Sequence, residues 1–107
     1  MATYTCAHAL TPTGLVHDVT IEVDGDFITS VSSGLPAPAG AINFGNVTLV
    51  PGFIDMHVHG GGSYSFSEGP EAAAKAARFH LGHGTTSLLA SLASAPLDDL
   101  ADQTVQL

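Results

Sequence analysis

The first half of the chain alternates between apolar and polar residues with the period of two that is typical of β-strands. Residues Thr3–Leu10 alternate weakly, and we expect an edge strand there, followed by a turn at Thr11–Gly14. The alternation is stronger in residues 19–23 and 26–31, on either side of Asp24-Gly25. This arrangement predicts a β-hairpin with a two-residue turn, because Asp and Gly tolerate the backbone angles that such turns need.

The stretch Pro51–Gly62, with the sequence PGFIDMHVHGGG, organises the rest of the chain. A loop over residues 32–40 and a short strand at 47–50 lead into it, and three glycines end it. Side chains on a strand point alternately to opposite faces. One face is therefore apolar, suits packing under a layer of helices, and comprises Ile54, Met56 and Val58. The other face is polar and comprises Asp55, His57 and His59.

The residue pattern in the second half of the chain predicts a helix, a strand and a second helix, in that order. Residues 63–69 are expected to form a loop. Residues 70–81 begin with Pro and Glu, continue with strong helix formers and are followed by Gly, which is the pattern of a capped helix. Residues 85–92 alternate as a strand does, and residues 97–107 carry apolar side chains at helical spacing. Because that helix has no C-terminal cap, we expect the protein to continue beyond Leu107.

Composition and charge exclude several classes of partner. The net charge is −8, and the only fixed cations are Lys75 and Arg78. Nucleic acid and anionic membranes would repel such a chain, so neither is expected as a partner.

The sequence contains no apolar run long enough for a transmembrane span and no signal peptide, which predicts a cytoplasmic protein. The single cysteine, Cys6, is expected to be a small buried side chain of its strand.

His57 and His59 are the candidate metal ligands. Imidazoles two residues apart share one face of a strand and can converge on a divalent ion at about 2.0–2.1 Å. Two such histidines can equally be ordinary hydrogen-bonded residues of a strand, and the spacing alone leaves both interpretations open.

The residues around this pair resemble a known family. The segment PGFIDMHVH (Pro51–His59) resembles the first barrel strand of the amidohydrolase superfamily, which comprises metal-dependent hydrolases. The segments His59–Ser67 and His83–Leu92, together with Ala95-Pro96, resemble the N-acetylglucosamine-6-phosphate deacetylases. The resemblance implies an α/β fold in which a (β/α)8 barrel follows part of a small β-sandwich. Residues 1–50 would belong to the sandwich, and residues 51–107 would form the first two β/α units of the barrel.

The resemblance also implies a reaction and a set of site residues. The whole enzyme would hydrolyse N-acetyl-D-glucosamine 6-phosphate to D-glucosamine 6-phosphate and acetate, with zinc, iron or manganese as the divalent metal. His57 and His59 would bind the metal. Asp55 lies on the same strand face but deeper, so it would at most support a metal-bound imidazole and would not bind the ion itself. Gly60, Gly61 and Gly62 would belong to a loop at the substrate mouth. The general-base aspartate would lie beyond Leu107. The phosphate-binding residues would come from missing parts of the chain or from the second subunit of a homodimer.

Length limits what this chain can do alone. A complete barrel takes roughly 250 residues and at least about 200, whereas this chain has 107. We therefore expect it to hold only the N-terminal portion of the enzyme and to be inactive by itself. Two alternatives remain: another amidohydrolase, such as a dihydroorotase, hydantoinase or deaminase, and a non-catalytic fragment.

Four further polar residues have a structural and a functional interpretation. His80 and His83 are three apart near a helix end, but that end would lie at the bottom of a barrel, so we favour structural roles over metal binding. Ser91 and Ser94 would touch substrate if they lie at the barrel mouth. For Ser94, capping of the last helix ahead of Pro96 is the favoured alternative.

Overall fold

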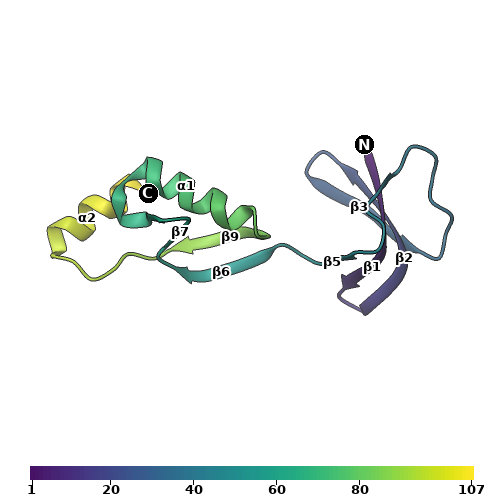
Figure 1. The fold of residues 1–107 in the computed structure, drawn as a ribbon, viewed down its shortest axis with the longest axis horizontal. Coiled ribbons are helices and arrows are strands. Elements are labelled where there is room, and N and C mark those ends of the chain that lie inside the picture. The colour runs from purple at the N-terminus through teal and green to yellow at the C-terminus, as the bar shows by residue number, and fades with distance from the viewer. The chain divides into compact units, whose positions relative to one another are not determined.

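A computed structural model describes all residues from Met1 to Leu107. The chain divides into two compact units, Met1–Pro51 and Gly52–Leu107, and each is described by itself (Figure 1). The assignment of these units to a sandwich and a barrel remains a prediction.

The first unit is a five-stranded mixed sheet. Its strands are β1 (Ala2–Thr11), β2 (Gly14–Asp24), β3 (Phe27–Ser33), β4 (Ile42–Asn43) and β5 (Thr48–Leu49). The order is β3-β2-β1-β4, and β5 also pairs with β1. The first three strands are antiparallel neighbours, whereas β4 and β5 run parallel to β1.

The prediction that the first strand lies at an edge is wrong. After β3 the chain crosses over and returns beside β1, where Ile42 pairs with Tyr4 and Thr48 pairs with His8. Strand β1 is therefore paired on both sides. Alternation along a segment indicates which of its side chains are apolar. It does not indicate how many strands pair with that segment, because the second partner of β1 comes from residues more than thirty positions further along the chain.

Both hairpins of this unit form. Thr11 pairs with Gly14 around the first turn, and the Thr11 Oγ1 hydroxyl donates a hydrogen bond to the Gly14 carbonyl at 2.9 Å. In the second hairpin Asp24 pairs with Phe27, so the two-residue turn is Gly25-Asp26, with Gly25 at a φ of 56°. The predicted hairpin is confirmed, and its turn lies one residue later than expected.

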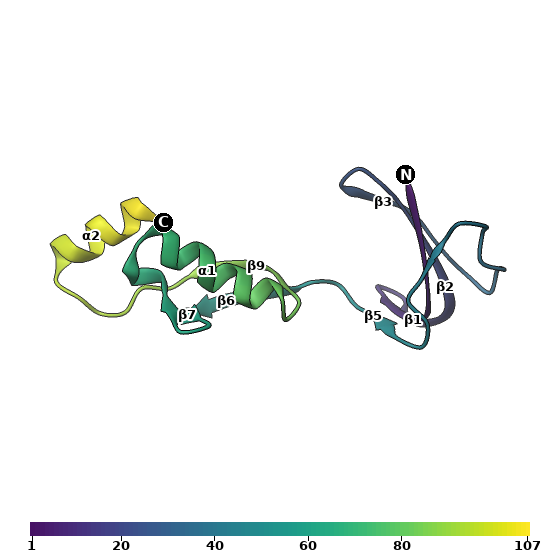
Figure 2. The same cartoon turned by 45° about the horizontal axis from the view of Figure 1, so that its top comes forward.

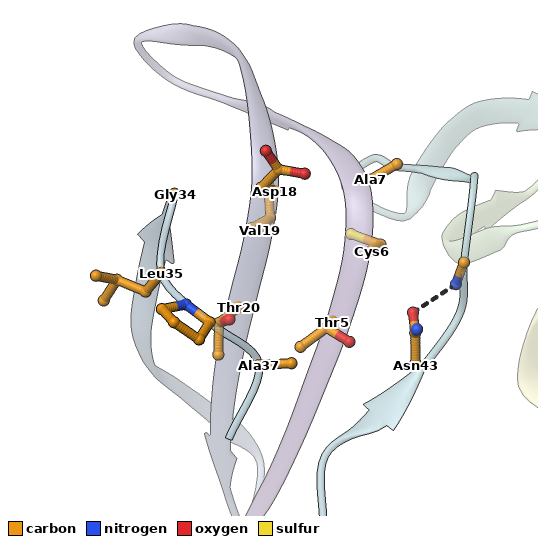
Figure 3. Close-up of a pocket in the computed structure, with 12 residues that line it drawn as sticks. Thr5, Cys6, Ala7, Asp18, Val19, Thr20, Gly34, Leu35, Ala37 and Asn43 are labelled. Atoms are coloured by element: carbon orange, nitrogen blue, oxygen red, sulfur yellow. Dashed lines mark hydrogen bonds between the residues drawn. The ribbon is translucent and has the colours of Figure 1, made fainter. Parts of the chain in front are cut away.

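The core of the first unit is small. It consists of Cys6, Ala9, Val19 and Ile21. Cys6 is 6% exposed, as expected for a small buried side chain. A cavity of about 470 Å³ lies over this part of the sheet, bordered by the segment after β3, and Figure 3 shows Thr5 and Asp18 on its wall.

The second unit is a β-α-β arrangement with a short hairpin inserted after the first strand. Strands β6 (Phe53–Val58) and β9 (Thr85–Ala90) are parallel, and helix α1 (Pro70–Leu81) connects them. Between β6 and α1 lie β7 (Gly60–Gly61), β8 (Tyr64–Ser65) and the short 3-10 helix η1 (Phe66–Glu68), and α2 (Leu97–Gln106) ends the chain. Figures 1 and 2 both show α1 running alongside β9.

Helix α1 forms where the sequence predicts it. Pro70 occupies its first turn together with Glu71, and Gly82 is the C-terminal cap residue. Ala76 faces inward and is fully buried, which allows the helix to pack closely. Helix α2 begins at Leu97, where the pattern predicts it, but its capping differs from the prediction, because the N-cap is Pro96 and no side chain caps the helix. Capping by Ser94 is therefore wrong.

Residues 63–69 are more ordered than the predicted loop. Tyr64 and Ser65 pair with Gly61 and Gly60, and a capping box starts η1: Ser67 N donates to Ser65 Oγ at 3.2 Å and Ser65 N donates to Glu68 Oε2 at 2.6 Å. Sequence reasoning missed this box, although its S-x-x-E signature is present.

The apolar face of β6 is not covered within this unit. Ile54 is 73% exposed and Met56 is 74% exposed. Neither α1 nor α2 covers this face, although the sequence predicted that helices would.

None of the helices is both long enough and apolar enough to cross a membrane.

Candidate metal centre

The two candidate ligands occupy different backbone environments at the end of β6. His57 lies inside the strand, between the pairs Asp55 with Leu88 and Val58 with Ala90, at a point where the register with β9 shifts and His57 itself has no partner residue on β9. His59 comes directly after the last strand residue, Val58, whose carbonyl accepts a hydrogen bond from Ser91 N at 2.9 Å. The paired residues on either side of His57 therefore anchor this part of β6, whereas the orientation of His59 depends on the β7–β8 hairpin.

The two imidazoles converge. His57 Nε2 and His59 Nε2 are 3.1 Å apart, the ring centroids are 5.1 Å apart, and the ring planes are inclined by 57°. Alternation along the strand brings both rings to one face, as predicted from the sequence. Both side chains are exposed, so an ion can reach them.

This spacing fits a shared divalent metal. Two nitrogens bonded to one ion at about 2.0–2.1 Å and lying 3.1 Å apart enclose an angle of roughly 100°, close to the tetrahedral value. The same distance also fits a hydrogen bond between one protonated and one unprotonated ring nitrogen. The residues present therefore fit two ligands of a metal site. No group of three or more His, Cys, Asp or Glu side chains is arranged to hold an ion.

Asp55 contacts the main chain of its own strand. Its Oδ1 accepts a hydrogen bond from the His57 backbone N–H at 3.1 Å. The carboxylate thus stiffens the turn of backbone that carries the first imidazole. Its support of a metal-bound ring remains a prediction.

Steric contacts in the structure explain why three glycines follow His59. A Cβ on Gly60 would overlap the Tyr64 carbonyl oxygen, and a Cβ on Gly61 would lie 2.6 Å from His80 Nε2. Gly62 has a φ of 58° and would meet the Phe79 ring at 2.9 Å. Glycine at these positions lets the β7–β8 hairpin lie against α1. A role at the substrate mouth remains a prediction.

His80 and His83 each donate a hydrogen bond to a main-chain carbonyl. His80 Nε2 donates to the Gly60 carbonyl oxygen at 2.8 Å, and His83 Nδ1 donates to the Phe79 carbonyl oxygen at 2.8 Å. Because a carbonyl only accepts, the proton is on Nε2 of His80 and on Nδ1 of His83. His83 caps α1. His80 instead reaches the residue next to His59, a contact that sequence reasoning missed because it joins positions twenty residues apart.

The second half of the chain matches a family, and the whole chain matches solved structures. Residues 48–107 match the model of the amidohydrolase family. N-acetyl-D-glucosamine-6-phosphate deacetylase from Mycobacterium smegmatis is 38% identical with a TM-score of 0.88, over 96% of this chain and 30% of that chain. A mutant of the deacetylase from that organism, in complex with N-acetyl-D-glucosamine-6-phosphate, gives the same two values over 95% of this chain and 27% of that chain. The resemblance to these deacetylases is confirmed.

A curated protein of another name matches a shorter stretch. Imidazolonepropionase from Streptomyces griseus is 41% identical over 51 residues, which are 46% of this chain and 13% of that protein. The chain therefore spans about an eighth of this curated relative and less than a third of the deacetylase structures.

Proposed function

The chain belongs to the amidohydrolase family, and we propose that it forms the metal-binding start of a hydrolase that removes the acetyl group from N-acetyl-D-glucosamine 6-phosphate. The observation that carries the proposal is the convergence of His57 Nε2 and His59 Nε2 to 3.1 Å at the end of β6. The likeness to a deacetylase over 96% of the chain supports the choice of substrate. In this proposal β6 and β9 are the first two strands of a (β/α)8 barrel, and β1–β5 belong to a small β-sandwich.

His57 and His59 would hold the divalent metal through Nε2. When bound, such an ion lowers the pKa of a coordinated water and polarises the amide carbonyl of the substrate. The chain's own contribution is position. The β6–β9 pairs at Asp55 and Val58 anchor the strand on either side of His57, and the hydrogen bond from His57 N to Asp55 Oδ1 stiffens the backbone between them.

The phosphate of the substrate needs cations, and this chain contains only two fixed ones. Lys75 Nζ lies 2.9 Å from Glu71 Oε1 and 5.0 Å from the centre of the Tyr64 ring, so its charge is already engaged. Arg78 is the only other fixed cation. We therefore propose that residues outside these 107 bind the phosphate and move the proton that the reaction requires.

A second candidate is the activity of the imidazolonepropionases. The 41% identity over 51 residues favours it. The deacetylase likeness extends over twice as much of the chain, and includes the first unit, which is why we prefer deacetylation.

The test has a binding part and a catalytic part. Metal content of the purified chain is measured after zinc loading, and we expect the double variant His57→Asn, His59→Asn to bind less metal than the unaltered chain. Equal metal content would refute the site.

In a protein of full deacetylase length that carries these residues, we expect acetate release to be faster from N-acetyl-D-glucosamine 6-phosphate than from the unphosphorylated sugar. Binding energy from the phosphate would orient the amide at the metal. Equal kcat/KM for the two sugars, or turnover of imidazolonepropionate instead, would overturn the choice of substrate.

A further inference from the structure

We propose that His80 is a positioning residue for His59, so that helix α1 tunes the metal affinity of the histidine pair. This inference rests on the proposed metal site. It assigns a role to a histidine that the sequence pattern gave no reason to connect with that site.

The contacts between the two parallel strands end just before His59. Beyond the last paired residues, Ser91 N donates a hydrogen bond to the Val58 carbonyl. The His59 carbonyl instead accepts a hydrogen bond from Phe66 N at 3.0 Å and a longer one from Ser65 Oγ at 3.4 Å. The direction of the His59 side chain therefore depends on the β7–β8 hairpin and the start of η1.

Gly60 is held from two sides. On one side Gly60 pairs with Ser65 across the β7–β8 hairpin. On the other side its carbonyl accepts the hydrogen bond from His80 Nε2 at 2.8 Å. The His80 side chain is half-buried, so water competes less for this bond than it would at an open surface. The peptide next to His59 is thereby tied to α1.

The surroundings fix the His80 ring. The His80 and Phe79 rings form a T-shaped pair, with a centroid distance of 5.5 Å and an angle of 81° between the ring planes. The backbone of Gly61 lies so close that a Cβ there would be 2.6 Å from His80 Nε2. With Phe79 and Gly61 this close, the His80 ring has little freedom to turn away from the Gly60 carbonyl.

The neighbouring His83 supplies a matched control. It lies at the same end of α1 and also makes one 2.8 Å hydrogen bond from an imidazole to a carbonyl, but its acceptor is Phe79 O, within the helix end. Loss of either hydrogen bond is expected to lower the stability of the C-terminal end of α1. Only loss of the His80 bond releases the peptide next to His59.

The experiment measures zinc affinity by calorimetry for His80→Leu, His80→Gln and His83→Leu in the 107-residue chain. We expect His80→Leu to bind zinc about two- to tenfold more weakly, the factor that one ordinary hydrogen bond corresponds to. Gln places an N–H at a similar reach from Cα, so His80→Gln should recover most of the affinity. His83→Leu should bind zinc as the unaltered chain does.

The possible outcomes separate this inference from the proposed function. Unchanged affinity in His80→Leu, or an equal loss in His83→Leu, overturns the role of His80. If the double variant at His57 and His59 also binds zinc normally, the metal site itself is refuted. Nitrogen-detected NMR of the unaltered chain gives a test that needs no substitution: we expect the Nε2-protonated form of His80, and the Nδ1-protonated form would overturn the inference.

Discussion

Replacing Gly61 with alanine tests whether the β7–β8 hairpin packs against α1. The added Cβ would lie 2.6 Å from His80 Nε2, 2.9 Å from Phe79 Cδ1 and 3.0 Å from His80 Cδ2. Comfortable separations are about 3.5–4.0 Å, so three contacts are short at once. The His80 ring is hydrogen-bonded to Gly60 O and packs edge-on against Phe79, and it has little room to retreat.

The expected cost follows from these contacts. Overpacking by a methyl group costs about 1–3 kcal/mol, and a shift of His80 that breaks its hydrogen bond adds about 0.5–1.5 kcal/mol. Gly61 has no positive φ, so the effect is steric rather than conformational. We expect a loss of about 2–4 kcal/mol in the free energy of unfolding of the second unit.

Gly82→Ala is the matched control for this substitution. Gly82 has a φ of −61° and a ψ of −14°, and its nearest contact would be Phe79 O at 3.4 Å. Alanine is compatible with that backbone and should leave stability unchanged or raise it by about 0.4–1 kcal/mol. Urea unfolding followed by circular dichroism, with amide exchange at Phe66 as a local probe, measures both variants. If Gly61→Ala were as stable as Gly82→Ala, the packing of the hairpin on α1 would be refuted.

Three further substitutions test other contacts of the second unit. Gly52→Ala would place a Cβ inside the Thr86 side chain, so we expect the free energy of unfolding, measured in urea, to fall by about 1–3 kcal/mol. Adding Thr86→Ala should recover part of this loss. An unchanged free energy of unfolding would contradict the close contact between Gly52 and Thr86. Ser65→Ala removes the acceptor for Ser67 N and should cost about 0.5–2 kcal/mol, visible as faster amide exchange in η1; unchanged exchange would argue against the capping box. Ala76→Leu adds volume at a fully buried position and should lower the thermal midpoint, whereas Ala74→Leu on the exposed side of α1 should not; equal midpoints would contradict the burial of Ala76.

Local sequence patterns predicted most helices and strands of this chain, but they did not predict contacts between residues far apart in the sequence. The second hairpin and the helix from Pro70 depend on residues close in sequence, and both are observed, although the hairpin turn is Gly25-Asp26 rather than Asp24-Gly25. Strand β1 gained its second neighbour only because the chain returns after a crossing. No periodicity carries that information.

The candidate site shows the same division. Alternation along β6 predicted that His57 and His59 share a face, and their Nε2 atoms do converge. The bond from His80 to Gly60 joins positions that only the folding of α1 back onto the hairpin brings together. The glycine triplet was the one available signal, since small residues mark places where a backbone is approached closely.

X-ray absorption spectroscopy of the zinc-loaded chain shows whether His57 and His59 bind the same ion. If His57 and His59 share one ion, the spectrum will show two imidazole nitrogens at about 2.0–2.1 Å from zinc. That contribution will disappear in the double variant His57→Asn, His59→Asn. Zinc that keeps two imidazole ligands in the double variant, or that has none in the unaltered chain, would contradict the account.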